Sequence, residues 1–408
     1  MQPTQRTGQS ITQKKQWKFT RKFFHILFLF IPLLATLSCE KPIAPITEPP
    51  GSGFYSLFNG RDMGGWILGV DPEESAWSVV DGVIHCKGEP KTPYLIVSEK
   101  EYENFEFYAE FRVSKECNSG IFYHVPLAGR QSRLGFETQI LDDHGRKPDK
   151  NSTGSIYDVV PPLTNAMRKA GVWNRYHVLF DWPICKIWLN DQLVQDTDFS
   201  QNPQLKYRMR RGPIGLSNHG FAVDYRNLWI KELPDRDTGR SVFNGRDLEG
   251  WTLIGDADWH VEGGVLVSSK GSGYLVTDRE YHGVYFHAYV DSDTLTSRDA
   301  CLYYRWTSAD NTGYRADFFD YLSAVRYTDQ YGDNIPPDVI RPMKSEWFLY
   351  RIISGDNLSQ VWLNEFLVSD NKLLGKPPRG RIALWRGAND GVIRIKGMVL
   401  RELDEPGI

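Results

Sequence analysis

The sequence is poor in cysteine, and its few cysteines lack the spacing of metal ligands. Five occur in 408 residues, and no pair forms a C-x-x-C element. Small zinc modules depend on such pairs, so nothing here supports a zinc ribbon or finger. The spacing specifies no disulfide either. We expect free thiols buried in strands at four positions: Cys86, Cys117, Cys185 and Cys301.

The sequence also lacks a large excess of charge and the short motifs of several common enzyme classes. Its formal net charge is −3, which gives no electrostatic basis for binding nucleic acid. No G-x-S-x-G element is present, as a Ser-His-Asp hydrolase of the α/β type would need. No glycine-rich loop of the phosphate-binding kind appears, so nucleotide chemistry has no support.

Long apolar runs are scarce, and the clearest one lies near the N-terminus. Phe23–Leu37 is shorter than a comfortable membrane span and follows a cluster of lysine and arginine, which is the pattern of a signal peptide. Ser38 directly precedes Cys39, as in bacterial lipoprotein cleavage sites. We predict a lipoprotein-type signal peptide over 1–39, lipidation of Cys39, and a Pro/Gly tether over 40–53. The protein would then be exported and held in the outer membrane by lipid, on its periplasmic or outer side.

Aromatic residues are plentiful, and many of them fall in segments that occur twice. The two copies keep one order, while the distance between them falls from 185 to 168 residues. This pattern indicates two homologous domains, the second with shorter loops. We place them at 54–233 and 241–403, with a linker at 234–240 and a tail at 404–408. The matching segments are Phe58–Trp66 with Phe243–Trp251, Trp77–Ile84 with Trp259–Leu266, Tyr94–Val97 with Tyr274–Thr277, Trp188–Asn190 with Trp362–Asn364, and Gly212–Leu216 with Gly380–Leu384.

Each copy has the pattern of short strands rather than helices. The stretch 105–113 alternates aromatic or apolar with polar residues, which predicts a strand with one buried face. Asp81-Gly82 and Gly263-Gly264 are hairpin-type turns between β-rich segments. One short helical turn fits only Leu163–Ala170. Many short strands with regular turns predict an all-β fold of two tandem sandwiches or jelly rolls.

A set of ordered motifs carries a family resemblance. The sequence resembles the 3-keto-disaccharide hydrolase domain, formerly a domain of unknown function, closely over 54–233 and more weakly over 241–403. The resemblance implies a concanavalin-like jelly roll and cleavage of glycosides or disaccharides already oxidised to a ketone at C3. The motifs are Leu57–Asp62 with Trp66, Trp77–Val83, Asn118–Ile121, Gly135–Asp142, Gly154–Tyr157, Trp173-Asn174, Trp188–Asn190, Gly212–Gly220 and Arg226-Asn227.

Such a reaction needs a base, a donor for the enolate oxygen and an acid for the leaving group. A ketone at C3 acidifies the hydrogen on C2, so a base can remove it while the aglycone leaves C1. The resemblance places Glu137, the region of Asp142 and the His219 loop on the concave face of the first domain. We take these three as the catalytic candidates, with His219 or Glu137 as the base. The candidates for substrate contacts are Asn118, Gln139, His144, Tyr157 and Arg112.

A cofactor is not required by any compact motif. Oxygen and nitrogen donors in the first copy nevertheless suit a divalent cation such as Ca²⁺, Mn²⁺ or Zn²⁺. Those donors are Glu137, Asp142, Asp143, His144 and His219.

The second copy keeps the framework motifs and changes the polar cluster. Arg315 aligns with Glu137 and Asp317 with Gln139, and the loop that matches His219 contains no histidine. We therefore expect the second domain to support the first, to bind ligand, or to shape a rim. Two other functions stay open: a non-catalytic carbohydrate-binding lipoprotein, and a glycosidase that uses two carboxylates on unmodified sugars.

Overall fold

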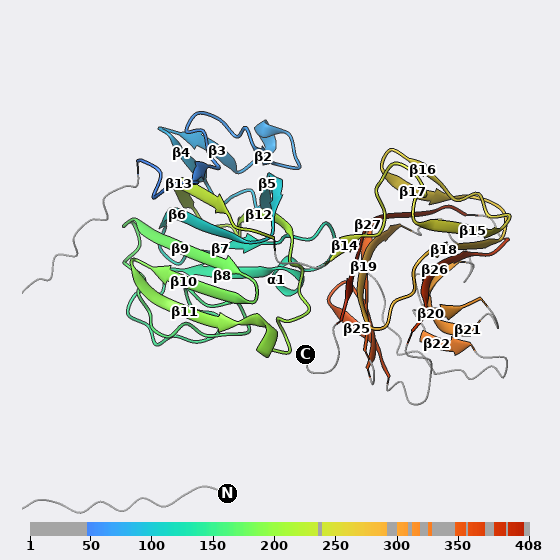
Figure 1. Ribbon diagram of the computed structural model, residues 1–408. Helices are drawn as coiled ribbons and strands as arrows, with labels where there is room; N and C mark the ends of the chain where they lie inside the picture. Colours follow the sequence, from blue (N-terminus) through green and yellow to red (C-terminus); the bar gives the residue numbers. More distant parts are fainter. Residues whose placement is uncertain are drawn as a thin grey trace, which may run out of the picture. The chain divides into compact units, whose positions relative to one another are not determined.

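The first copy folds into two antiparallel sheets that enclose one core (Figure 1). The computed structural model describes residues 47–235, 239–291, 300–308, 312–318, 325–328, 347–355, 358–371, 379–388 and 391–403. One sheet has the order β11-β10-β9-β6-β13-β4-β3, with β1 paired to β13, and the other has the order β2-β5-β12-β7-β8. The strands of the first sheet are β1 Tyr55–Ser56, β3 Trp77–Val80, β4 Val83–Cys86, β6 Phe105–Val113, β9 Asn174–Asp181, β10 Ile184–Leu189, β11 Gln192–Asp198 and β13 Val223–Glu232. Those of the second are β2 Trp66–Ile67, β5 Leu95–Tyr102, β7 Asn118–Tyr123, β8 Phe136–Leu141 and β12 Gly212–Ser217.

The second copy repeats this strand order. Its larger sheet runs β16-β17-β27-β19-β23-β24-β25, with β14 paired to β27, and its other sheet runs β15-β18-β26-β20-β21-β22. The predicted all-β fold of two tandem sandwiches is confirmed. The strands are β14 Arg240–Ser241, β15 Trp251–Gly255, β16 His260–Glu262, β17 Val265–Ser268, β18 Gly273–Thr277, β19 Val284–Asp291, β20 Ala300–Thr307, β21 Thr312–Asp317, β22 Val325–Thr328, β23 Phe348–Ser354, β24 Ser359–Leu363, β25 Phe366–Asn371, β26 Arg381–Arg386 and β27 Ile393–Glu402.

Side-chain alternation builds the cores. The five residues of β6 at odd positions, from Phe105 to Val113, are each at most 2% exposed and join one hydrophobic cluster. Asp81 and Gly82 both have positive φ, 50° and 74°, between β3 and β4. Two such residues in succession form a turn whose twist matches a tight hairpin. The predicted strand and turn are therefore confirmed, and the four cysteines within the described residues are buried and free.

Equivalent tryptophans hold equivalent places in the two sandwiches. The indole N–H of Trp66 donates to the Leu57 carbonyl, and that of Trp251 donates to the Val242 carbonyl. Trp188 and Trp362 each follow a register shift in the hairpin that contains them. The duplication therefore extends from sequence to local hydrogen bonding.

Strand pairing corrects one sequence alignment. Trp66 pairs with Ser98, and Trp251 pairs with Thr277, so Leu95 rather than Tyr94 is the counterpart of Tyr274. A shift of one residue matters because successive side chains in a strand point to opposite faces. Tyr94 therefore has no tyrosine counterpart in the second copy.

The predicted helical turn at Leu163–Ala170 is wrong. The structure has no helix there, and the described helices are α1 (Gln131–Leu134) and two short 3-10 helices, η1 (Pro72–Glu74) and η2 (Phe199–Gln201). Asn165 explains the difference, because its side chain accepts from the Met167 N–H and donates to the Asp143 and Arg146 carbonyls. Side-chain bonds of this kind compete with helix formation.

The described residues belong to one compact unit, Pro42–Ile408. Cys39 and the predicted signal peptide lie outside the described residues. No helix within the described part of the chain is long and apolar enough to cross a membrane.

Candidate active site

A small polar pocket lies on the outer face of the sheet that contains β7 and β8. Phe136 and Ile140 belong to the core cluster, so alternation along β8 sends Glu137 and Gln139 to the opposite face. The loop around His219 and the segment before β8 complete the walls. The pocket is lined by Tyr94, Asn118, Arg130, Gln131, Ser132, Glu137, Gln139, Tyr157 and His219. Five of the eight residues proposed from sequence as catalytic or substrate-contacting groups therefore meet here: Glu137, His219, Asn118, Gln139 and Tyr157.

Glu137 is a buried carboxyl group in the lining of this pocket. The residue is 4% exposed, and burial raises its pKa to about 8, against the opposing positive charge of Arg130. The groups around the Gln139 amide favour the orientation in which its nitrogen donates to Glu137 Oε1 at 3.1 Å and to the Ser119 carbonyl at 2.9 Å. Glu137 therefore carries a proton at neutral pH and can deliver it to a ligand.

Gly120 on β7 makes the space that Glu137 occupies. It lies in the strand next to Glu137, and a Cβ placed on it would come within 2.2 Å of Glu137 Oε1 and 2.9 Å of Cγ and Cδ. The second copy has Cys301 at the corresponding position, opposite Asp317 as Gly120 is opposite Gln139. The absence of a side chain at residue 120 is therefore specific to the copy that has the glutamate.

We expect Gly120→Ala to reduce the activity of the first domain at least about tenfold, because a displaced Glu137 carboxyl no longer reaches its working position. Gly120 is not among the positive-φ glycines, so an alanine backbone fits there without strain. Steady-state kinetics of the full chain measures the loss of activity, and a thermal melt shows whether the variant still folds. Cys301→Ala in the second copy is the matched control and should leave the rate unchanged; an equal loss in both variants would contradict the assignment.

His219 lies beside Tyr94 in the lining of the pocket. The Tyr94 hydroxyl lies 3.4 Å from His219 Nε2, and the two rings meet edge to face with centroids 5.0 Å apart. Burial, and then the positive charge of Lys91, lower the pKa of His219 below its ordinary value. Burial raises the pKa of Tyr94 to about 12, and the charge of Glu137 adds to this. His219 is therefore neutral at pH 7 and can accept a proton, whereas Tyr94 keeps its own.

Asn218 fixes the loop that carries His219. Its backbone N–H donates to the Tyr94 carbonyl at 2.7 Å, and its side-chain amide donates to the Pro90 carbonyl at 3.1 Å. Its side-chain oxygen accepts from the N–H of Gly220, whose φ of 92° suits glycine. The turn that the sequence shows as Asn-His-Gly is therefore a support that directs the imidazole toward Tyr94.

Two candidates near the end of β8 lie outside the pocket lining. Asp142 accepts from the Glu116 backbone N–H at 3.0 Å. The ring of His144 is exposed, and its Nδ1 lies 2.6 Å from the Met167 carbonyl. Both residues follow Leu141, where the chain leaves the sheet, so these polar groups stabilise a turn instead of facing the pocket.

Arg112 lies on the other sheet, in β6, and not at the pocket. Its guanidinium donates to Asp224 at 2.9 and 2.7 Å, across the pair of β6 and β13, and stacks on the ring of Trp173. The second copy has the same cross-strand pair with the charges exchanged, since Arg394 binds Asp291. Arg112 is thus part of the duplicated framework.

The donors suggested for a divalent cation do not converge. Asp143 is 2% exposed, and its carboxylate accepts from the backbone N–H and the hydroxyl of Thr153. Asp142 and His144 bond to the backbone as described above, which separates them from Glu137 and His219. Among the described residues, no group of three or more His, Cys, Asp or Glu side chains is arranged to hold a metal ion. The five residues do not fit a shared metal site.

Sequence reasoning missed four residues of the pocket. Tyr94 was read only as part of a repeated strand, and Arg130, Gln131 and Ser132 follow no motif or periodicity. These last three surround the start of α1, whose position depends on contacts distant in sequence. An arginine after Ala-Gly in a loop carries no signal by itself.

The second copy fills the corresponding face with apolar side chains. Val276, Cys301, Tyr303, Trp306 and Ala383 form a buried cluster, with Tyr274 and Trp385 packed against it. Arg315 replaces Glu137 there, donates to Asp317 at 2.6 Å and stacks on Trp385. The described part of this face therefore has neither the carboxyl group nor the imidazole of the first copy.

Comparison with known proteins finds a similar sequence and similar structures. The chain is 26% identical over 229 residues to the 3-keto-disaccharide hydrolase of Bacteroides thetaiotaomicron, an alignment that covers 44% of this chain and 79% of that protein. Two crystal structures assigned as glycosyl hydrolases in Parabacteroides distasonis ATCC 8503 are also similar. They share 27% and 25% identity, cover 45% and 44% of this chain and 94% and 99% of their own, and give TM-scores of 0.40 and 0.39.

The family model described as the 3-keto-alpha-glucoside-1,2-lyase-like domain matches residues 53–231 and again residues 238–398. The two matches together include most of the chain, and the predicted resemblance is confirmed. The chain belongs to this family and contains its domain twice.

Proposed function

We propose that the first sandwich cleaves 3-keto-glycosides, with His219 as the base and Glu137 as the acid. The observation that carries this proposal is that one pocket shifts the pKa values of two titratable groups in opposite directions. Burial lowers the pKa of His219 and raises that of Glu137 to about 8, so near neutral pH the imidazole is free of its extra proton while the carboxyl keeps its own. Such a pair is ready for base and acid catalysis at the same pH. The family and the named relative support a sugar substrate.

The reaction begins with elimination. His219 takes the proton from C2, and the electrons of that bond move to the C3 oxygen to give an enolate. The enolate re-forms the ketone as C1=C2 forms and the C1–O bond breaks, and Glu137 gives its proton to the departing aglycone oxygen. The negative charge that develops on the C3 oxygen faces Arg130 and the amide of Asn118, both of which line the pocket. The product is an unsaturated ketone, a 2-hydroxy-enone.

Hydration completes net hydrolysis with the same two groups. Glu137, now a carboxylate, takes a proton from water as the water oxygen adds to C1. His219, now protonated, exchanges its proton with solvent as the aglycone leaves and then gives a proton to C2, which restores the 3-keto sugar and both starting protonation states. Each group thus acts once as acid and once as base, as reversibility between the two steps requires.

The pH dependence follows from the two pKa shifts. We expect a bell-shaped profile of kcat/KM, because activity needs neutral His219 and protonated Glu137. The alkaline limb should fall near pH 8, and the acid limb should lie below the ordinary histidine pKa of about 6.5. In Glu137→Gln the remaining activity should lose the alkaline limb. A wild-type profile that rises steadily through pH 8 to 9 would contradict this assignment.

A two-carboxylate glycosidase fits the pocket less well. Glu137 is the single carboxylate among the nine residues that line it, whereas that mechanism needs two carboxyl groups at a set separation. The non-catalytic carbohydrate-binding alternative differs in outcome, since a binding protein would retain a 3-keto-glycoside without releasing its aglycone.

We also propose that the protein is exported and lipid-anchored through Cys39. Support comes from the basic and apolar pattern before Ser38-Cys39. In a bacterial host, we expect the mature chain to begin at Cys39 with attached lipid, and Cys39→Ala to abolish the lipid. Mass spectrometry of the N-terminal peptide measures both. A mature chain without lipid that begins elsewhere would contradict the proposal.

A further inference from the structure

We infer that the second sandwich positions the active-site segment Leu127–Leu134 of the first sandwich, through Tyr289 and Glu365. This segment connects β7 with β8, and its residues Arg130, Gln131 and Ser132 line the pocket. The inference rests on the proposed function for its effect on catalysis, and on printed contacts of the described residues for its geometry.

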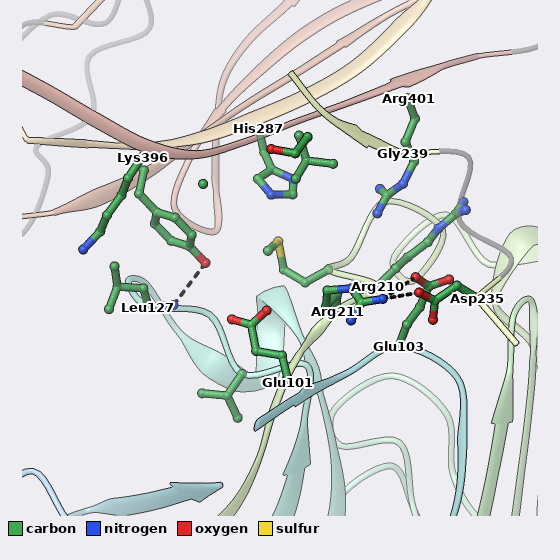
Figure 2. Close-up of a pocket in the computed structure, with 16 residues that line it drawn as sticks. Glu101, Glu103, Leu127, Arg210, Arg211, Asp235, Gly239, His287, Lys396 and Arg401 are labelled. Atoms are coloured by element: carbon green, nitrogen blue, oxygen red, sulfur yellow. Dashed lines mark hydrogen bonds and ion pairs between the residues drawn. The ribbon is translucent and has the colours of Figure 1, made fainter. Parts of the chain in front are cut away.

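Two hydrogen bonds from the second sandwich fix the backbone of the segment. The Leu127 N–H donates to the Tyr289 hydroxyl at 3.1 Å, shown as a dashed line in Figure 2. The Arg130 N–H donates to Glu365 Oε2 at 3.0 Å. Arg130 is the N-cap residue of α1, its own side chain makes no capping bond, and Glu365 is the acceptor for its backbone N–H.

Close packing surrounds these bonds. Gly129 has φ of 82°, and a Cβ on it would come within 2.9 Å of Asn364 Cβ, so the segment can approach the β24–β25 turn only with glycine there. Leu134 and Leu349 are fully buried, and together with Met209 they form one apolar cluster against which Tyr289 packs. The contact is therefore both polar and apolar.

The turn that makes this contact is itself well supported. Asn364 bonds twice with Leu349, once through its backbone N–H and once through its side-chain oxygen. Arg351 donates to the Asn364 carbonyl at 3.1 Å and to the Tyr207 carbonyl of the first sandwich at 3.0 Å. A turn held from both sides can transmit its position to the residues bound on it.

Comparison with the corresponding turn of the first copy shows how the contacts of Glu365 and Tyr289 differ from those of their counterparts. Asp191 follows Asn190 as Glu365 follows Asn364, and the side chain of Asp191 is 80% exposed. At the other contact, Tyr289 pairs with Lys396 where Glu110 pairs with Arg226, so a tyrosine occupies the place of a framework ion pair. The tyrosine is thus a feature of the second copy, and the carboxylate at the turn, present in both copies, binds the Arg130 backbone only as Glu365.

The experiment uses the full chain and three variants: Glu365→Ala, Glu365→Gln and Tyr289→Phe. Losing one backbone bond at a pocket-lining segment should lower kcat/KM about tenfold in the alanine and phenylalanine variants. Glu365→Gln keeps an acceptor oxygen and should recover most of the rate. Asp191→Ala, at the matched turn of the first copy, should leave the rate unchanged.

Hydrogen exchange gives a readout that does not depend on activity. Amides of 127–134 should exchange faster in Glu365→Ala than in the wild type or Asp191→Ala, while amides of β6 stay protected. Unchanged exchange in this segment would overturn the inference. If exchange rises but rates stay normal, the positioning role in catalysis is overturned. If His219→Ala and Glu137→Gln also keep full activity, the failure lies in the proposed function, and the exchange result still decides the contact.

Discussion

His219→Ala is expected to lower the turnover of a 3-keto-glucoside by roughly 10²–10⁴-fold, because removal of a general base typically costs that much. The imidazole is held by the Asn218 turn and by Tyr94, so its loss leaves the pocket walls in place. Steady-state kinetics on purified full-length protein measures the effect. The second-copy variant Arg315→Ala is the control, since Arg315 stands where Glu137 stands in the first copy.

The acid can be separated from the base by the choice of aglycone. Glu137→Gln should lose activity strongly on an alkyl glycoside, whose alkoxide needs a proton to leave. It should lose little on a nitrophenyl glycoside, which departs without one. His219→Ala should be slow on both. Near-normal rates in His219→Ala would refute the base, and a large loss from Arg315→Ala alone would move the site to the second sandwich.

Glu137→Gln is expected to stabilise the first sandwich while it slows cleavage of glycosides whose aglycone needs a proton to leave. The folded pKa of about 8 lies above the unfolded value near 4.5, so the folded state binds the proton more tightly. Stability from this group is complete below pH 4.5 and is lost as pH rises to about 8. At 1.36 kcal/mol for each pKa unit, the loss reaches about 5 kcal/mol above pH 8. Glutamine is neutral in the folded and the unfolded state, so the Glu137→Gln variant does not undergo this loss of stability.

Urea unfolding between pH 5 and pH 9 tests this. The difference in the free energy of unfolding between Glu137→Gln and the wild type should be smallest at pH 5, grow with pH and level off above about pH 8. A difference that stays constant over this range, or a wild-type free energy of unfolding that rises relative to that of the variant toward pH 9, would contradict this. Either result would show that the fold does not hold the Glu137 carboxyl protonated.

The fold was largely predictable, because two-residue alternation and repeated motifs are local properties of the sequence. The stretch 105–113 showed its buried face directly, and the same rule put Glu137 and Gln139 together. The limit of the rule is that it does not say which outer face of a sandwich carries the site. Arg112 has the same alternating pattern, yet it lies on the other sheet in an ion pair.

The rest of the site depends on contacts between distant segments. Tyr94 meets His219 only because Asn218 bonds to the Tyr94 backbone. Arg130 lines the pocket on a segment that Glu365 and Tyr289 hold, more than 150 residues later in the chain. Asp142 looked catalytic because it follows a family-like strand, but a turn uses its carboxylate. Sequence patterns mark strands and turns well, whereas packing decides which polar groups converge.

The central claim is tested most directly by giving the purified protein a 3-keto-glucoside and the parent glucoside, each in deuterium oxide. The account predicts release of the aglycone from the 3-keto compound alone, with deuterium at C2 of the sugar product, because the proton on C2 is removed and then replaced. Release from the parent glucoside at a comparable rate, or a product of the 3-keto compound without deuterium at C2, would contradict it.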